Sequence, residues 1–215
     1  MTVQTEQLPR GRHHPSREEV QASQRQRMLL AIAAAMADKG YAGTSVADVI
    51  KRAGVSRETF YQQFSSKLDC FMSAFDVAGQ VLLARLDDTA GHAAAGDEAP
   101  IDRFDRAVGV YLESLAAQPA LARVFLVEVY AAGPEAIARR AALQGAIVDR
   151  MARLLGLADH DRFACEVLVA GVGALVTAPL VADDLASLHR LRTQLVDLVH
   201  RALPLRPTST TGEPS

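Results

Sequence analysis

Residues 41–71 read YAGTSVADVIKRAGVSRETFYQQFSSKLDCF, and this stretch decides the fold of the first third of the chain. Apolar residues at helical spacing predict a short helix after Ser45 and another from Ser56 to about Phe64. Ala53-Gly54-Val55 separates them, and glycine supplies the positive φ that a tight turn between helices requires. The stretch therefore predicts a helix-turn-helix.

The helix from Ser56 to Phe64 has an apolar face and a polar face. Phe60 and Phe64 lie on the apolar face, which we expect to be buried. The polar face carries groups that suit base edges and phosphates, namely Ser56, Arg57, Thr59, Tyr61, Gln62 and Gln63. Solvation alone also produces a polar face on so short a helix, so the helix by itself leaves DNA binding open.

The order of residues around this pair of helices resembles the TetR family of bacterial regulators, over about the first third of the chain. The match runs through Gly40-Tyr41, Thr44-Ser45, Ala53-Gly54-Val55-Ser56, Thr59-Phe60-Tyr61, Phe64 and Lys67. Two positions depart from the family pattern. Ile50 stands where Ala is frequent, which affects packing, and Glu58 stands where a small residue is common, which affects base reading.

The resemblance implies that the helix from Ser56 to Phe64 lies in the major groove. The expected DNA contacts are Thr44, Ser45, Ser56, Arg57, Glu58, Thr59, Tyr61, Gln62 and Lys67. Arg57 either reads guanine or holds a phosphate, and both remain open. Glu58 either accepts a hydrogen bond from cytosine or simply favours a helix N-terminus. We expect Lys67 to contact the phosphate backbone.

The composition favours an all-α protein. Hydrophobic residues make up 49% of the 215 residues and aromatic residues only 5%, and Val and Ile occur at helical spacing. We expect about nine helices in two domains, a three-helix DNA-binding domain over 16–65 and a helical effector-binding and dimerisation domain over 66–204. Residues 1–15 are expected to form a flexible basic arm, and 205–215 a disordered tail.

Charge is distributed unevenly along the chain. The net charge is −2, whereas residues 1–70 carry ten basic against seven acidic side chains. This pattern fits a DNA-binding end joined to an acidic body. The apolar run 164–182 contains Glu166 and Pro179, so we expect a buried helix and no contact with a membrane. Cys70 and Cys165 indicate reduced thiols in a cytoplasmic protein.

The resemblance also implies an effector cavity in the body. The expected lining residues are Phe104, Val108, Tyr111, Phe125, Glu128, Val129, Tyr130, Ile147 and Met151. Their apolar character indicates a small, mostly hydrophobic effector. Glu128, alone in an apolar run, either orients a polar group of the ligand or pairs with an arginine such as Arg139 or Arg140.

The last two helices are expected to form a dimer interface. Leucines recur at steps of three and four from Leu188 to Leu198, which is typical of a helix seeking a partner helix. Packing within the chain could satisfy this pattern, but the resemblance implies a four-helix interface between two copies. The expected interface residues are Gly171, Leu175, Leu188, Leu191, Leu195 and Leu198.

These features together predict a ligand-responsive regulator, most simply a repressor, that binds a palindromic double-stranded DNA operator as a homodimer and leaves it when the effector binds. The six histidines form no H-E-x-x-H motif, and the sequence has no nucleophile elbow or phosphate loop. We therefore expect no catalytic residues, metal or cofactor. A helical-bundle enzyme, or an adaptor with a DNA-binding head, is the alternative.

Overall fold

The computed structural model describes residues 16–93, 98–157 and 161–202, and this part of the chain contains helices and no strand, which confirms the all-α prediction. The elements in chain order are α1 (Arg17–Gly43), α2 (Val46–Ala53), α3 (Arg57–Gln63), α4 (Lys67–Ala93), α5 (Pro100–Ala117), α6 (Pro119–Leu126), the 3-10 helix η1 (Glu128–Ala132), α7 (Pro134–Leu155), α8 (Arg162–Val181) and α9 (Leu185–Ala202). The expected arm 1–15 and tail 205–215 lie outside the described residues.

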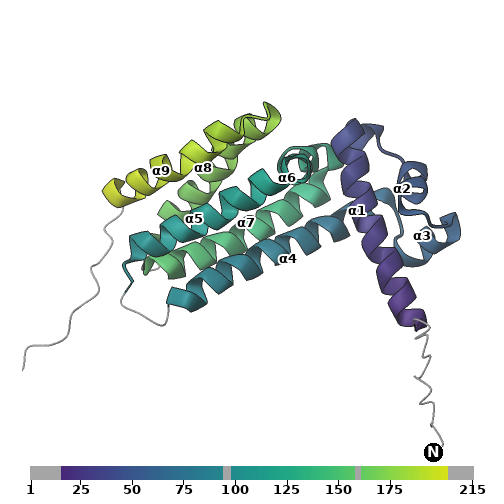
Figure 1. Cartoon of the computed structure of the whole chain (residues 1–215), viewed down its shortest axis with the longest axis horizontal. Helices are drawn as coiled ribbons and strands as arrows, with labels where there is room; N and C mark the ends of the chain where they lie inside the picture. The colour runs from purple at the N-terminus through teal and green to yellow at the C-terminus, as the bar shows by residue number, and fades with distance from the viewer. Residues whose placement is uncertain (1–15, 94–97, 158–160, 203–215) are drawn as a thin grey trace, which may run out of the picture.

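Helices α1, α2 and α3 form a head at one end of the molecule (Figure 1), where α2 and α3 lie on the far side of α1 from the body. The local sequence sets their ends. Ser45 caps α2 in a capping box with Asp48, Gly54 ends α2 with φ 63°, and the Ser56 side chain caps α3. The turn between α2 and α3 therefore forms as its sequence predicts.

Helix α1 contains a kink near its end. We call the contact region between head and body at this kink, Gly40–Thr44 with Lys67 and Glu128, the joint. Ser16 and Glu19 form the capping box at its start. Gly40 adopts φ 70° and ψ 171°, a conformation that favours glycine, and interrupts the helix before Tyr41. The Thr44 hydroxyl donates to the Gly40 carbonyl oxygen at 2.8 Å and fixes the bend.

The body consists of α4 to α9, with α4, α5 and α7 running side by side and α8 and α9 on the side away from α4 (Figure 1). Pro100, Pro119 and Pro134 each stand in the first turn of a helix, where proline is tolerated because no intrahelical N–H bond is needed. The sequence did not indicate the break after α6, where Val127 leaves the α-helix and the chain continues as η1.

Two large buried clusters hold the described residues together. The first joins the head to the beginning of α4 and also includes Val124, Val129 and Ala132 from α6 and η1. The second fills the space between α5, α7, α8 and α9. The first cluster therefore packs α6 and η1 directly against α1.

Candidate DNA-binding surface and effector cavity

The outer face of α3 presents four exposed side chains in two contacting pairs. The Arg57 guanidinium lies over the Tyr61 ring, 5.4 Å from its centroid. Gln62 Nε2 donates to Glu58 Oε1 at 3.2 Å, one helical turn away. Phe60 on the inner face is fully buried. These pairs hold a cation, a carboxylate, an amide and a phenol on a single exposed surface.

Two serines among the expected DNA contacts, Ser45 and Ser56, cap the helices next to this face. Ser56 Oγ accepts from the Thr59 amide at 3.0 Å, and the two hydroxyls lie 2.8 Å apart. Ser45 Oγ donates to Asp48 Oδ2 at 2.7 Å and accepts from the Asp48 amide. The pKa of Asp48 is held well below its usual range, because Lys39 donates a hydrogen bond to the carboxylate and Ser45 adds two more. Both serines are exposed at helix N-termini, where anions bind readily.

Two of the expected DNA contacts point into the protein. Thr44 is only 3% exposed, and its hydroxyl is used at the α1 bend. Lys67 Nζ donates to the carbonyl oxygens of Tyr41 at 2.8 Å and Thr44 at 2.9 Å, and lies 4.0 Å from the centroid of the Tyr41 ring. Burial lowers the pKa of Lys67. In this structure the ammonium group ties the start of α4 to the end of α1, and its expected phosphate contact stays a prediction.

A cavity of about 400 Å³ lies between α1, α4, α5, α6, α7 and α8, and its lining is mostly apolar. This volume is typical of a small-molecule site. Leu30 of α1 and Val77 and Val81 of α4 line it while remaining at least 48% exposed, so they mark its open side. Because α1 contributes Leu29, Leu30 and Ala33, the cavity is bounded by both the head and the body.

Six of the nine expected lining residues border this cavity, namely Phe104, Val108, Tyr111, Phe125, Ile147 and Met151. The other three, Glu128, Val129 and Tyr130, do not. Val129 is fully buried in the cluster beneath the head, and Tyr130 is 53% exposed. Glu128 Oε2 accepts from the Tyr41 amide at 2.7 Å, so its carboxylate faces α1. These three residues miss the cavity because they lie in η1, where Glu128 and Val129 face α1.

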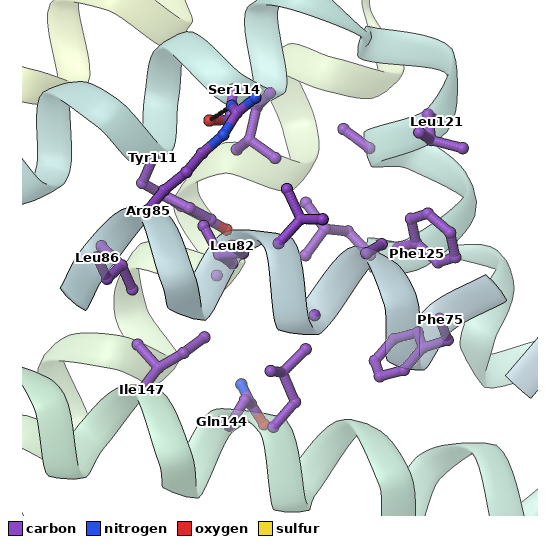
Figure 2. A pocket seen from close by; sticks show the side chains of 18 of the residues that line it. Phe75, Leu82, Arg85, Leu86, Tyr111, Ser114, Leu121, Phe125, Gln144 and Ile147 are labelled. Atoms are coloured by element: carbon purple, nitrogen blue, oxygen red, sulfur yellow. Dashed lines mark hydrogen bonds between the residues drawn. The ribbon is translucent and has the colours of Figure 1, made fainter. Parts of the chain in front are cut away.

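Polar residues that the sequence reasoning missed also line the cavity, among them Arg85, Ser114, Arg140 and Gln144. Figure 2 shows Tyr111 and Gln144 reaching into the cavity from α5 and α7, and the hydrogen bond of 2.7 Å from Arg85 to Ser114. Burial raises the pKa of Tyr111 to about 12, although the nearby charge of Arg140 acts in the opposite direction. In the sequence, an arginine on an otherwise apolar helix face is the signal that could have indicated Arg85 and Arg140.

The expected dimer residues divide into two groups. Leu188, Leu191 and Leu195 are buried within the protomer, because α9 packs against α5. These three leucines thus belong to the core of one chain, and their expected role in a dimer interface stays a prediction. Leu175 and Leu198 are about half exposed, and Gly171 is partly exposed. Additional apolar side chains are exposed along α8, namely Phe163, Val167 and Val181.

Helix α8 is long and apolar enough to cross a membrane by length and composition alone. Within the protein it packs against α6, α7 and α9. Cys165 on this helix is fully buried, whereas Phe163 is 72% exposed. The helix therefore contributes one face to the core and leaves an apolar face uncovered in the isolated chain.

Residues 29–74 match the family described as bacterial regulatory proteins, tetR family. A search of curated proteins gave no match. Among solved structures, the fatty acid degradation regulator FadR of Bacillus halodurans has a TM-score of 0.73 at 20% identity and covers 85% of this chain and 97% of its own. FadR of Bacillus subtilis, solved in complex with stearoyl-CoA, has a TM-score of 0.72 at 18% identity, with 83% and 98% covered.

A TetR-family transcriptional regulator from Bordetella parapertussis has a TM-score of 0.60 at 23% identity, with 81% of this chain and 92% of its own chain covered. At such identities the likeness establishes the fold. The exposed helix-turn-helix lies within the matched segment and has the arrangement of a DNA-binding domain of bacterial regulators. The match over residues 29–74 shows that this segment, which runs from α1 into α4, resembles the bacterial regulatory proteins of the tetR family.

Proposed function

We propose that the chain is a cytoplasmic repressor that binds a palindromic operator as a homodimer and is released by a small, mostly hydrophobic effector. The observation that carries this proposal is the cavity whose walls belong to both the head and the body. A ligand there contacts α1 of the DNA-binding head directly. No cofactor or catalytic group is part of the proposal.

The proposed DNA-binding domain comprises residues 16–65, and the proposed DNA surface is the outer face of α3 with the two caps beside it. It comprises Ser45, Ser56, Arg57, Glu58, Thr59, Tyr61 and Gln62. Arg57 supplies a guanidinium that can bond guanine O6 and N7. Because Tyr61 restrains its side chain, the arginine loses less conformational freedom when it binds. Thr44 and Lys67 are left out, since their polar groups serve the joint.

The proposed dimer interface is the uncovered apolar face of α8 with the adjoining edge of α9. It comprises Phe163, Val167, Gly171, Leu175, Val181 and Leu198. A contiguous apolar surface of this kind is costly in water and typical of an association site. A second copy covers it by symmetry, and the pair presents two α3 helices to the two halves of a palindrome.

The proposed transmission begins at the cavity walls. Helix α4 extends from the head into the body, and α6 and η1 contact α1. A ligand that separates these helices favours a different head position, and only its preference for that conformation can shift the equilibrium. The FadR complex with stearoyl-CoA supports this proposal, because it shows that the same fold can bind a molecule with a long acyl chain.

The test is binding of the full chain to its own promoter DNA, measured by fluorescence anisotropy over a range of salt concentrations. We expect a palindromic site to resist nonspecific competitor, and Arg57→Ala to relax specificity at one position. Arg52→Ala is the matched control, because Arg52 is exposed on α2 and paired with Asp38. Light scattering should give a dimer mass. Binding without sequence preference, or a monomer on DNA, would contradict the proposal.

A further inference from the structure

Arg140 is a cation in an apolar cavity wall with no carboxylate partner among the described residues. Its neighbour Arg139 pairs with Asp76 and Glu135, whereas the Arg140 guanidinium contacts only uncharged groups. Nη1 donates to Gln144 Oε1 at 2.9 Å, and the group lies over the Tyr130 ring at 5.1 Å from its centroid. A half-buried guanidinium of this kind lacks the counter-ion that would offset its desolvation.

Gly173 of α8 lies next to Arg140 and Gln144, with room for a Cβ at ordinary van der Waals distance. A Cβ at that position would lie 3.6 Å from Arg140 Nη2 and 3.9 Å from Gln144 Nε2. Both residues and Gly173 line the cavity. Remaining N–H groups of Arg140 and the amide N–H groups of Gln144 are therefore positioned near its surface.

Tyr111 adds a third donor from the opposite wall. Its ring lines the cavity from α5 and its hydroxyl points into it (Figure 2). With its pKa raised to about 12 by burial, the phenol keeps its proton at neutral pH and can donate it in a hydrogen bond. Arg140, Gln144 and Tyr111 together offer a cation and hydrogen-bond donors within a mostly apolar cavity, which is the complement of a carboxylate on an aliphatic chain.

We propose that the effector is a free aliphatic carboxylic acid, whose carboxylate binds Arg140, Gln144 and Tyr111 while its chain occupies the apolar remainder of the cavity. This inference rests on the proposed sensor function and specifies its ligand class. A thioester of the same acid lacks the charge that Arg140 would neutralise. Arg85, the other arginine of the cavity, is exposed and donates to Ser114, so it is not assigned this role.

The test is isothermal titration of the full-length protein with dodecanoic acid, 1-dodecanol and dodecanoyl-CoA, each below its micellar concentration. We expect the wild type to bind the acid about tenfold to a hundredfold more tightly than the alcohol, as a charge-assisted hydrogen bond allows. From decanoic to dodecanoic acid, affinity should rise about fourfold for each added methylene. Arg140→Gln should abolish the preference for the acid and leave binding of the alcohol within about threefold.

Arg85→Gln is the matched control, because it removes the other cavity arginine and should leave the preference for the acid intact. Tyr111→Phe serves as a second variant if Arg140→Gln fails to fold, and should reduce the preference by a smaller factor. Equal binding of acid and alcohol by the wild type, or loss of the preference in Arg85→Gln alone, would overturn the inference. Tighter binding of dodecanoyl-CoA that survives Arg140→Gln would also overturn it.

Binding of neither acid nor alcohol would likewise refute this ligand class. The operator and dimer measurements described above use no ligand. Their failure would therefore refute the proposed regulator independently of these titrations.

Discussion

The head and the body are both helical, but their interiors differ. Ile32 in the head is fully buried in a cluster that contains Phe60 and Phe71. Ile147 in the body is only partly buried and borders a cavity of about 400 Å³. The head is packed to hold α3 in one position, whereas the body retains space that a ligand can fill. The same residue type therefore has a different role in each region.

The largest expected effect comes from shortening these two isoleucines. Ile32→Ala should lower the free energy of unfolding by about 2–5 kcal/mol, because the side chain is fully buried and its loss leaves a cavity in the cluster. Ile147→Ala should cost only about 1 kcal/mol, because its side chain already borders open space. Urea unfolding of both variants measures the difference. Equal losses would show that the two interiors are packed alike.

Lys67 provides a sharper test of how the head is joined to the body. Lys67→Met keeps the aliphatic part of the side chain but removes the hydrogen bonds to Tyr41 and Thr44, and should cost about 1–2 kcal/mol. The slope of log affinity for DNA against log salt should stay the same, since the ammonium group faces the protein. A slope reduced by about one unit would instead identify Lys67 as a phosphate contact.

The head could be predicted from the sequence further than the body, and the reason is distance along the chain. Ser45 with Asp48, Gly54 and Ser56 determine structure through neighbours within a few residues, so their patterns indicate turns and caps directly. The contacts of Lys67 lie beyond any local pattern, because its partners stand 23 and 26 residues earlier. A long cationic side chain at a helix start is compatible with either role.

The body depends on contacts that periodicity does not specify. Glu128 bonds an amide 87 residues away. The leucine pattern from Leu188 to Leu195 indicated a partner helix, but the partner is α5 of the same chain. Likewise, apolar periodicity does not distinguish a core residue from one that lines a cavity. Arg140 stands on an otherwise apolar helix face, but only the packing of α7 against α8 shows that this face lines a cavity.

Glu128 tests whether the two regions are coupled through the joint. Glu128→Ala removes the acceptor of the Tyr41 amide and should accelerate hydrogen exchange at that amide by about tenfold. Glu135→Ala is the matched control, since Glu135 is exposed and its ion pair with Arg139 is long, at 4.0 Å. Unchanged exchange at Tyr41 would mean that η1 does not restrain the joint.

The smallest expected effect concerns the acid sensitivity of the head. The pKa of Asp48 is lowered in the folded protein, so its stabilising contribution is present above the ordinary carboxylate range and is lost as the pH falls below about 4. Asp48→Asn should therefore make stability less dependent on pH in that range. Urea unfolding followed by circular dichroism at pH 3 and pH 6 measures this difference. An identical pH dependence in variant and wild type would contradict the assigned hydrogen bonds.

The central claim is that a ligand in the body cavity moves the head, and a distance between the two heads of a dimer tests it most directly. Spin labels at Lys51→Cys report this distance from exposed positions on α2, while Cys70 and Cys165 are buried and protected from labelling. Saturating dodecanoic acid should shift the distance away from the value found on operator DNA and weaken operator binding at least tenfold. Bound acid with both quantities unchanged would contradict the claim.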